Sequence, residues 1–141
     1  MLGPLIAKKK VRSAFSYFND RNMEKFLALW DDNAVFIYPG KLSVSGTKRG
    51  KKAVSDWFRN LMDAGPSVHF SIKSICVDNI FDLIGTNVIT VEWVNSVTSR
   101  KGINILVSGV SVIRIKKGKI IKVCDYIFNP EKLPIAWCEE G

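Results

Sequence analysis

The stretch Arg114–Pro130, RIKKGKIIKVCDYIFNP, indicates how the C-terminal half of this chain folds. Two β-branched runs flank Lys117-Gly118, a dipeptide typical of a tight hairpin turn, so the runs should pair as antiparallel strands. The segment is basic and apolar, and Asp125 is the only acidic residue between Trp93 and Pro130. Which side of the sheet this carboxylate faces therefore becomes the central question about the strand.

Strand patterns extend from this hairpin back to Pro66. Four segments are rich in β-branched residues and are separated by turn residues: Val68–Asp78, Leu83–Val94, Ile103–Lys116 and Lys119–Phe128. Consecutive strands without intervening helices cannot form parallel βαβ units. The sequence therefore predicts a mostly antiparallel sheet.

The N-terminal half predicts three helices and one short strand. The first helix is opened by Pro4, the second carries an apolar stripe, and the third runs from Lys51 to Asp63. The stripe of the second helix consists of Met23, Phe26, Leu27 and Trp30. With a strand at Ala34–Tyr38 and no repeat or linker, this order predicts a single α+β domain, 1–141, with helices on one face of the sheet.

The composition is that of a globular protein with a basic surplus. The chain has 141 residues, of which 47% are hydrophobic, and a formal net charge of +8. The basic residues gather at Lys8–Lys10 with Arg12, at Lys48–Lys52 and at Arg114–Lys122. Such clusters could attract nucleic acid, anionic lipid or an anionic substrate. Because none interleaves exposed aromatic residues, we expect solvated faces and no nucleic-acid partner.

Targeting and metal signals are weak. No apolar run approaches the ~20 residues of a membrane span, and positive charges follow the N-terminal apolar stretch, the reverse of a secretory signal. We therefore expect a cytoplasmic protein with no membrane partner. Cys76, Cys124 and Cys138 are widely spaced and His69 is the single histidine, so we expect reduced thiols and no metal site.

Alternation along the last strand places Asp125 on the inner face. Asp125 shares parity with Ile121, Val123 and Ile127, whereas Lys122 shares parity with Ile120, Cys124 and Tyr126. A lysine prefers water, so the set that contains Asp125 should face the helices.

The same sorting predicts the lining of a pocket. It turns Asn87, Trp93 and Ser111 inward and Arg114 outward, and it leaves the face of Tyr38 undecided. An apolar concave surface that holds a few polar groups is what a small-molecule site requires. We therefore predict a ligand cavity whose polar candidates are Asp125, Ser111, Asn87 and Tyr38.

Four stretches carry a resemblance to a known superfamily: FNDRNMEKFLALWDDNAVF (Phe18–Phe36), GTKRGKKAVSDWF (Gly46–Phe58), RIKKGKI (Arg114–Ile120) and CDYIFNP (Cys124–Pro130). With the order of elements, they resemble the nuclear-transport-factor-two-like superfamily, in particular its SnoaL-like and ketosteroid-isomerase-like (polyketide cyclase-like) members. The resemblance implies a cone-shaped fold, in which a strongly curved, mostly antiparallel sheet and three N-terminal helices enclose a cavity. It also implies a homodimer through the outer face of the sheet and no cofactor.

The residues of ketosteroid isomerase are not retained. That enzyme needs an Asp base, a Tyr and a protonated Asp, and the matching positions here hold Tyr38, Ala14 and Ser111. Typical steroid isomerisation is therefore not expected, although the match supports Tyr38 and Ser111 as facing the cavity. Epoxide-hydrolase-like members use an Asp-Arg-Asp set, and parity turns no arginine of the sheet inward.

The last strand matches another branch better. SnoaL-like cyclases carry an acid/base aspartate on this strand after an R…GKI hairpin, and here the pattern reads Arg114, Gly118-Lys119-Ile120 and Asp125. The resemblance implies that Asp125 transfers protons, because an apolar setting raises the pKa of a carboxyl group. The alternative is a structural carboxylate bonded to its neighbours.

Two functions remain open from the sequence, which does not establish that the protein is an enzyme. The first is binding of a small, moderately apolar, oxygenated molecule, with isomerisation, cyclisation or dehydration by Asp125. In this hypothesis Tyr38, Asn87 and Ser111 are hydrogen-bond partners of the ligand. The rings of Trp30, Trp57 and Trp93 either stack on the ligand or pack the core. The second is a non-catalytic dimerisation or protein-interaction module. A solid core favours the module, and an open cleft that reaches Asp125 favours the enzyme.

Overall fold

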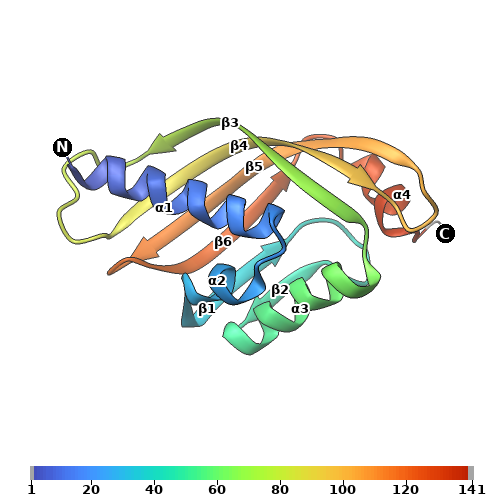
Figure 1. Cartoon of the computed structure of the whole chain (residues 1–141), viewed down its shortest axis with the longest axis horizontal. Helices are drawn as coiled ribbons and strands as arrows, with labels where there is room; N and C mark the ends of the chain where they lie inside the picture. The colour runs from blue at the N-terminus through green and yellow to red at the C-terminus, as the bar shows by residue number, and fades with distance from the viewer. Residues whose placement is uncertain (1, 140–141) are drawn as a thin grey trace.

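The computed structural model describes residues 2–139, which form one six-stranded sheet with helices packed against it (Figure 1). The elements, in order, are α1 (Leu2–Asn19), α2 (Met23–Ala28), β1 (Trp30–Tyr38), β2 (Gly46–Arg49), α3 (Lys51–Ala64), β3 (Ser67–Val77), β4 (Asn87–Thr98), β5 (Asn104–Lys116), β6 (Lys119–Ile127), the 3-10 turn η1 (Pro130–Lys132) and α4 (Leu133–Trp137).

The sheet has the strand order β2-β1-β6-β5-β4-β3 and is not closed. All neighbouring strands are antiparallel except β1 and β6, which run parallel with Phe36 opposite Val123. The predicted α+β fold with a mostly antiparallel sheet and N-terminal helices is confirmed. The parallel pair joins the first long strand of the chain to the last.

The helices cover one face of the sheet, and the strands alternate accordingly. Along β4, the side chains of Ile89, Val91 and Trp93 are buried, whereas Glu92 between them is exposed. On β5, Arg114 is exposed between two buried isoleucines. Helix α1 contacts β3, and α3 contacts β1. This pattern confirms the inward and outward faces predicted for these two strands.

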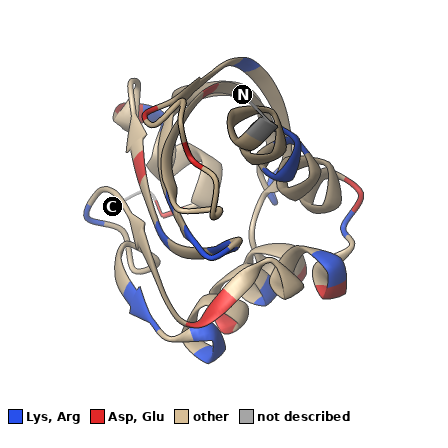
Figure 2. Cartoon of the chain, turned by 90° about the vertical axis from the view of Figure 1, so that its left-hand side faces the viewer, with Lys and Arg blue, Asp and Glu red and all other residues tan. Residues whose placement is uncertain are grey.

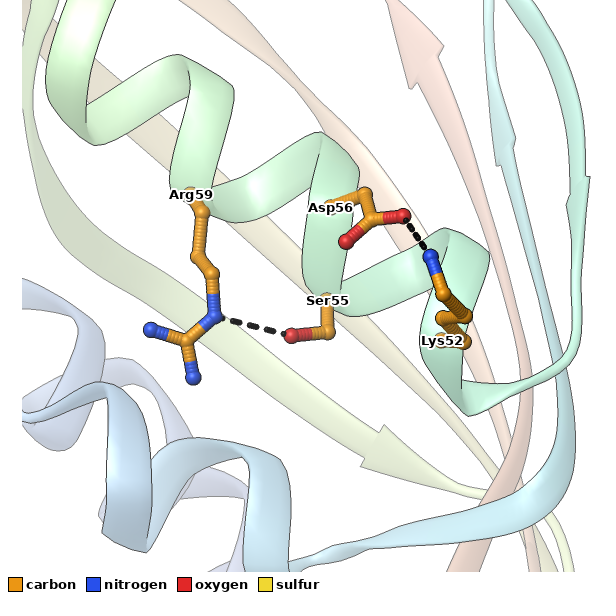
Figure 3. A network of polar contacts seen from close by, with 4 residues as sticks. All are labelled: Lys52, Ser55, Asp56 and Arg59. Atoms are coloured by element: carbon orange, nitrogen blue, oxygen red, sulfur yellow. Dashed lines mark hydrogen bonds and ion pairs between the residues drawn. The ribbon is translucent and has the colours of Figure 1, made fainter.

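The outer surface of α3 is polar. Lys52 Nζ lies 2.9 Å from Asp56 Oδ2, and Arg59 Nε donates to Ser55 Oγ at 3.1 Å (Figure 3). Both members of the ion pair are exposed, so the pair contributes little stability. The opposite side of the helix holds the core through its buried residues Val54, Trp57, Phe58 and Leu61. Burial of this apolar face, which the sequence predicted, holds α3 in place.

A β-bulge changes the inward set of β6. Arg114 pairs with Lys122, but Ile115 pairs with Ile120, so Ile121 is an extra residue on β6. Ile120 is therefore buried. The prediction that Ile120 shares the outer face with Lys122 is wrong, because strict alternation takes no account of a bulge.

Several predicted boundaries are also wrong. Helix α2 ends at Ala28 and Trp30 already belongs to β1, which begins before the predicted Ala34. Trp30 fits the apolar stripe of a helix as well as the start of a strand. From within β1 it still packs against Phe26 of α2, at a ring-centroid distance of 5.8 Å. Strand β4 begins at Asn87 and not at Leu83. Strand β2, η1 and α4 were not predicted.

Among residues 2–139, no helix is long and apolar enough to cross a membrane. Within the same range, no group of three or more His, Cys, Asp or Glu side chains could hold a metal ion. Cys76, Cys124 and Cys138 are free thiols.

Candidate functional site

A cavity lies between the inner face of the sheet and the helices. Its volume is about 100 Å³, far above the ~10–15 Å³ that one water needs. Its wall is largely aromatic, with rings from Phe15, Phe18, Phe26, Trp30, Phe36, Tyr38, Trp57, Phe58, Phe70, Trp93 and Trp137. The core is thus not packed solid, and Asp125 borders the remaining space.

A chain of hydrogen bonds across three strands holds Asp125. The indole Nε1 of Trp93 donates to Ser111 Oγ at 2.9 Å, and Ser111 Oγ donates to Asp125 Oδ1 at 2.6 Å. The sheet register accounts for the second bond, because Ser111 on β5 lies opposite Asp125 on β6. Oδ2 of Asp125 accepts no hydrogen bond from any described residue. One carboxylate oxygen is therefore fixed while the other remains available.

Gly109 makes the first of these bonds possible. It lies opposite Trp93 in the register of β4 and β5. A Cβ at this position would lie 2.3 Å from the carbonyl oxygen of Tyr126 and 2.9 Å from Cη2 of Trp93. Only a residue without a side chain lets the indole lie over β5 and reach Ser111.

The cavity changes the acidity of Asp125. Burial raises its pKa from 3.8 to about 7, and the hydrogen bond from Ser111 opposes this rise. Desolvation disfavours the charged form of a carboxyl group, which accounts for the direction. Near neutral pH the protonated and ionised forms are both populated, so Asp125 can donate or accept a proton.

Tyr38 supplies a neutral hydroxyl to the same cavity. Its oxygen accepts a hydrogen bond of 3.0 Å from Trp137 Nε1. Burial raises the Tyr38 pKa well above its usual value, the Trp137 bond lowers it, and the charge of Asp125 raises it. Because the oxygen is used as the acceptor for Trp137, the phenolic proton remains free for donation.

Two buried polar atoms of the cavity wall lack partners among the described residues: Asn95 Oδ1 and Trp30 Nε1. Leaving a buried donor or acceptor unpaired costs about 1–3 kcal/mol. A ligand hydroxyl would satisfy Asn95, and a ligand oxygen would satisfy Trp30. Asn95 was not predicted as a site residue, because the predicted strand ended at Val94. Trp137 was not predicted either; the apolar residues of Leu133–Trp137 were a signal for the short helix that carries it.

The structure brings six of the seven predicted site residues together. Asp125, Tyr38, Ser111, Trp30, Trp57 and Trp93 all line the cavity. Trp57 donates its Nε1 to Val44 O at 2.8 Å, so it offers its ring and not its polar edge. Asn87 lies elsewhere: it borders a separate hollow, and its Nδ2 donates to Asn79 O at 2.8 Å.

Known proteins match most of this chain in sequence. Residues 11–123 match the family of SnoaL-like domains. A Bacillus subtilis relative, the uncharacterised protein YesE, is 27% identical over 126 residues, which cover 88% of this chain and 82% of YesE.

Solved structures share the fold. A nuclear-transport-factor-two-like protein of unknown function from Burkholderia pseudomallei has a TM-score of 0.80 at 19% identity, covering 92% of this chain and 96% of its own. RV0760c from Mycobacterium tuberculosis, in complex with estradiol-17β-hemisuccinate, has a TM-score of 0.72 at 24% identity, covering 85% of this chain and 92% of its own. The superfamily resemblance is thereby confirmed, and the chain belongs to the SnoaL-like domain family.

Proposed function

We propose that the protein binds a small, moderately apolar, oxygen-bearing molecule in the cavity and that Asp125 transfers a proton to or from it. The observation that carries this proposal is a carboxyl group with a pKa of about 7 and a free Oδ2 in an aromatic cavity. A general base is most effective when its pKa lies near the working pH. Isomerisation, cyclisation and dehydration are the reactions that such a group supports without a cofactor.

The roles of the residues follow for a substrate with an enolisable carbonyl. In a substrate whose carbonyl has a C=C bond one carbon further along, Oδ2 of Asp125 takes a proton from the carbon between the two groups. The electron pair of the broken C–H bond forms a new C=C bond, and the π pair of the carbonyl moves onto its oxygen. Tyr38 donates a hydrogen bond to that oxygen. Asp125 then delivers the proton to the far carbon of the original C=C bond, the carbonyl re-forms, and the shifted double bond completes the isomerisation. The aromatic wall excludes water and strengthens these interactions.

The ligand class rests on the lining of the cavity. The flat aromatic walls favour a ring-bearing molecule, and the unpaired Asn95 Oδ1 favours one with a hydroxyl group away from the reacting carbonyl. The complex of RV0760c with estradiol-17β-hemisuccinate supports a ligand of this general kind, because that protein shares the fold.

A second candidate is a non-catalytic module that dimerises through the outer face of the sheet. Its support is three exposed apolar or aromatic side chains on β5 and at the end of β6: Leu106, Tyr126 and Phe128. Dimerisation is also compatible with the first proposal. The two functions therefore differ in the chemistry of Asp125 and not in the oligomeric state.

Deuterium exchange separates the two functions. The probe is 2-tetralone, a bicyclic ketone with acidic protons beside its carbonyl, and loss of these protons in D2O is followed by NMR. We expect the protein to accelerate exchange and Asp125→Asn to reduce the acceleration by at least about 100-fold, the usual contribution of a general base. The matched control is Asp63→Asn, at an exposed position on α3.

Binding is measured separately, through quenching of tryptophan fluorescence by 2-naphthol. Binding without exchange that depends on Asp125 would contradict the catalytic role and favour the module. Absence of both would contradict the proposed ligand class.

A further inference from the structure

The loop between β3 and β4, residues 78–86, turns its apolar side chains outward. Phe81 is 76% exposed, Leu83 is 90% exposed and Ile84 is 73% exposed, and Ile80 is exposed as well. Exposed apolar residues that stand alone are ordinary, but a contiguous group marks an interaction surface. Four such residues within one short loop form a group of this kind.

Polar side chains of the same loop satisfy part of its backbone. Asp82 is buried, and its Oδ1 accepts hydrogen bonds from the backbone N–H groups of Ile84 at 3.0 Å and Thr86 at 3.1 Å. Asn79 Oδ1 accepts from the N–H of Phe81 at 2.9 Å. The side chain of Asn87 in turn bonds both backbone groups of Asn79. The exposed apolar side chains therefore belong to a loop in which several backbone donors are already paired.

The first turns of α1 extend this surface. A Cβ on Gly3 would lie 1.7 Å from Asp82 O, so the absence of a side chain there lets α1 abut the loop. Ile6 and Leu83 border the same shallow hollow. Leu5 and Ile6 are themselves exposed. We call the set Leu5, Ile6, Ile80, Phe81, Leu83 and Ile84 the apolar end patch.

Basic residues surround the apolar end patch. The β5–β6 hairpin touches the loop through a hydrogen bond of 3.0 Å from Gly118 N to Gly85 O, and Lys10 Nζ donates to Gly118 O. Residues 3–12, 78–86 and 116–119 together hold seven Lys or Arg against two Asp. Two of the three basic clusters of the sequence thus meet at one end of the molecule, which faces the viewer in Figure 2.

We propose that this end of the protein docks on an anionic lipid surface, with the apolar end patch at the boundary of headgroups and acyl chains. Apolar side chains with basic residues around them are the combination that binds such surfaces. Each Lys or Arg near an anionic bilayer adds about 1 kcal/mol of attraction. Nucleic acid would leave the aliphatic side chains unused, so lipid accounts for both features together. No helix among residues 2–139 is long and apolar enough to span a membrane, and the proposed surface contact requires none.

Docking would leave the site accessible. Helix α4, which carries Trp137 of the cavity wall, lies at the opposite end of the molecule from the apolar end patch (Figure 1). The surface would therefore hold the protein by the end remote from Trp137.

Sedimentation with vesicles tests the proposal. The full chain is mixed with vesicles of phosphatidylcholine and phosphatidylserine in a 3:2 ratio, or of phosphatidylcholine alone. We expect binding to the anionic vesicles that weakens between 50 and 500 mM salt. The double variant Phe81→Ser/Leu83→Ser should lower the partition coefficient at least about tenfold, since two exposed side chains no longer enter the bilayer. These positions make no side-chain contact that the fold requires, and circular dichroism verifies folding.

Ile103→Ser, at an exposed apolar position in the turn between β4 and β5, is the control and should bind as the parent does. No binding to anionic vesicles, or an equal loss in the control, would overturn the proposal. The proposal would also be overturned if the protein bound single-stranded DNA but not vesicles, and if the Phe81→Ser/Leu83→Ser variant bound the DNA as well as the parent does. A dimer that this variant dissociates, again without vesicle binding, would assign the patch to a second copy of the chain instead.

Discussion

Ser111 donates a hydrogen bond of 2.6 Å from Oγ to Oδ1 of Asp125, and it is the only described residue that bonds this carboxyl group. Since the bond stabilises the ionised form, Ser111 sets how far burial can raise the Asp125 pKa. Ser111 is therefore the residue whose replacement should change the acid most directly.

Replacing Ser111 with Ala should raise the Asp125 pKa further above about 7. It should also lower the free energy of unfolding by about 1–3 kcal/mol, because Trp93 Nε1 loses its acceptor. Carboxyl carbon NMR during a pH titration measures the first effect, and urea denaturation measures the second. Ser111→Thr, which keeps the hydroxyl, is the control. An unchanged titration in Ser111→Ala would show that the hydrogen bond has no influence on the acid.

The stability of the protein should fall as the pH rises from about 4 to about 7. The folded-state pKa of Asp125 is raised to about 7 from 3.8. In this interval the unfolded chain is ionised at Asp125 and the folded chain is protonated, so the unfolded state binds fewer protons and stability decreases with pH. The loss is at most ~1.4 kcal/mol per pH unit and ends above the folded-state pKa.

Asp125→Asn removes this ionisation, so the variant should lack the Asp125 part of the decline and exceed the parent in stability at pH 8. Denaturant unfolding of both proteins at several pH values gives the difference. Parallel curves across the interval would contradict the raised pKa.

Two buried asparagines on β4 should respond to leucine with opposite signs. Asn95 and Asn87 are each 6% exposed, but Asn95 Oδ1 has no partner among the described residues and Asn87 is bonded to Asn79 on both amide atoms. Asn95→Leu should raise the free energy of unfolding by about 1 kcal/mol, because it removes an unpaired polar group. Asn87→Leu should lower it by at least about 2 kcal/mol, because loop bonds are lost.

Thermal or urea denaturation measures both asparagine variants, and quenching of tryptophan fluorescence by 2-naphthol should weaken in Asn95→Leu alone. The Asn95 amide thus lowers the stability of the fold and is kept because it binds the ligand. Destabilisation by Asn95→Leu would refute this assignment.

Gly109→Ala should displace the Trp93 indole. The new Cβ would collide with the carbonyl oxygen of Tyr126 and with the ring, and overpacking of this kind costs about 1–3 kcal/mol. The Nε1–H of Trp93 should then exchange faster with solvent, which proton NMR detects. Ser108→Ala, next to it on β5 with its side chain facing outward, should leave the exchange unchanged. Slow exchange in Gly109→Ala would show that the strand accommodates the methyl group.

Much of the fold could be predicted because the local signals agree with it. The alternation on β4 and β5 and the apolar face of α3 are periodic over many residues, so burial follows the pattern. The prediction for Ile120 failed because the bulge in β6 depends on the register with β5, and a local pattern contains no information on that register. The helical assignment of Trp30 failed because this residue fits both a helical stripe and the start of a strand.

The site was predictable to the extent that it lies on regular strands. Ser111, Trp93 and Asp125 meet because they share the inner face of neighbouring strands, which parity captures. Asn87 also has inward parity. It lies at the start of β4, however, where its amide is hydrogen-bonded to the backbone of Asn79 in the preceding loop. Trp137 reaches Tyr38 only through the tertiary placement of α4, and no periodicity of the sequence encodes that contact.

The parallel pairing of β1 with β6 has a consequence for biosynthesis. Phe36 meets Val123 only after β6 has left the ribosome, so β1 lacks this neighbouring strand while the segments between β1 and β6 are being made. Until then β6 does not cover the aromatic rings of α2, α3 and β1, although β2 can already pair with β1. Contacts of such long sequence separation form slowly, and we expect the emerging polypeptide to depend on chaperones over that interval.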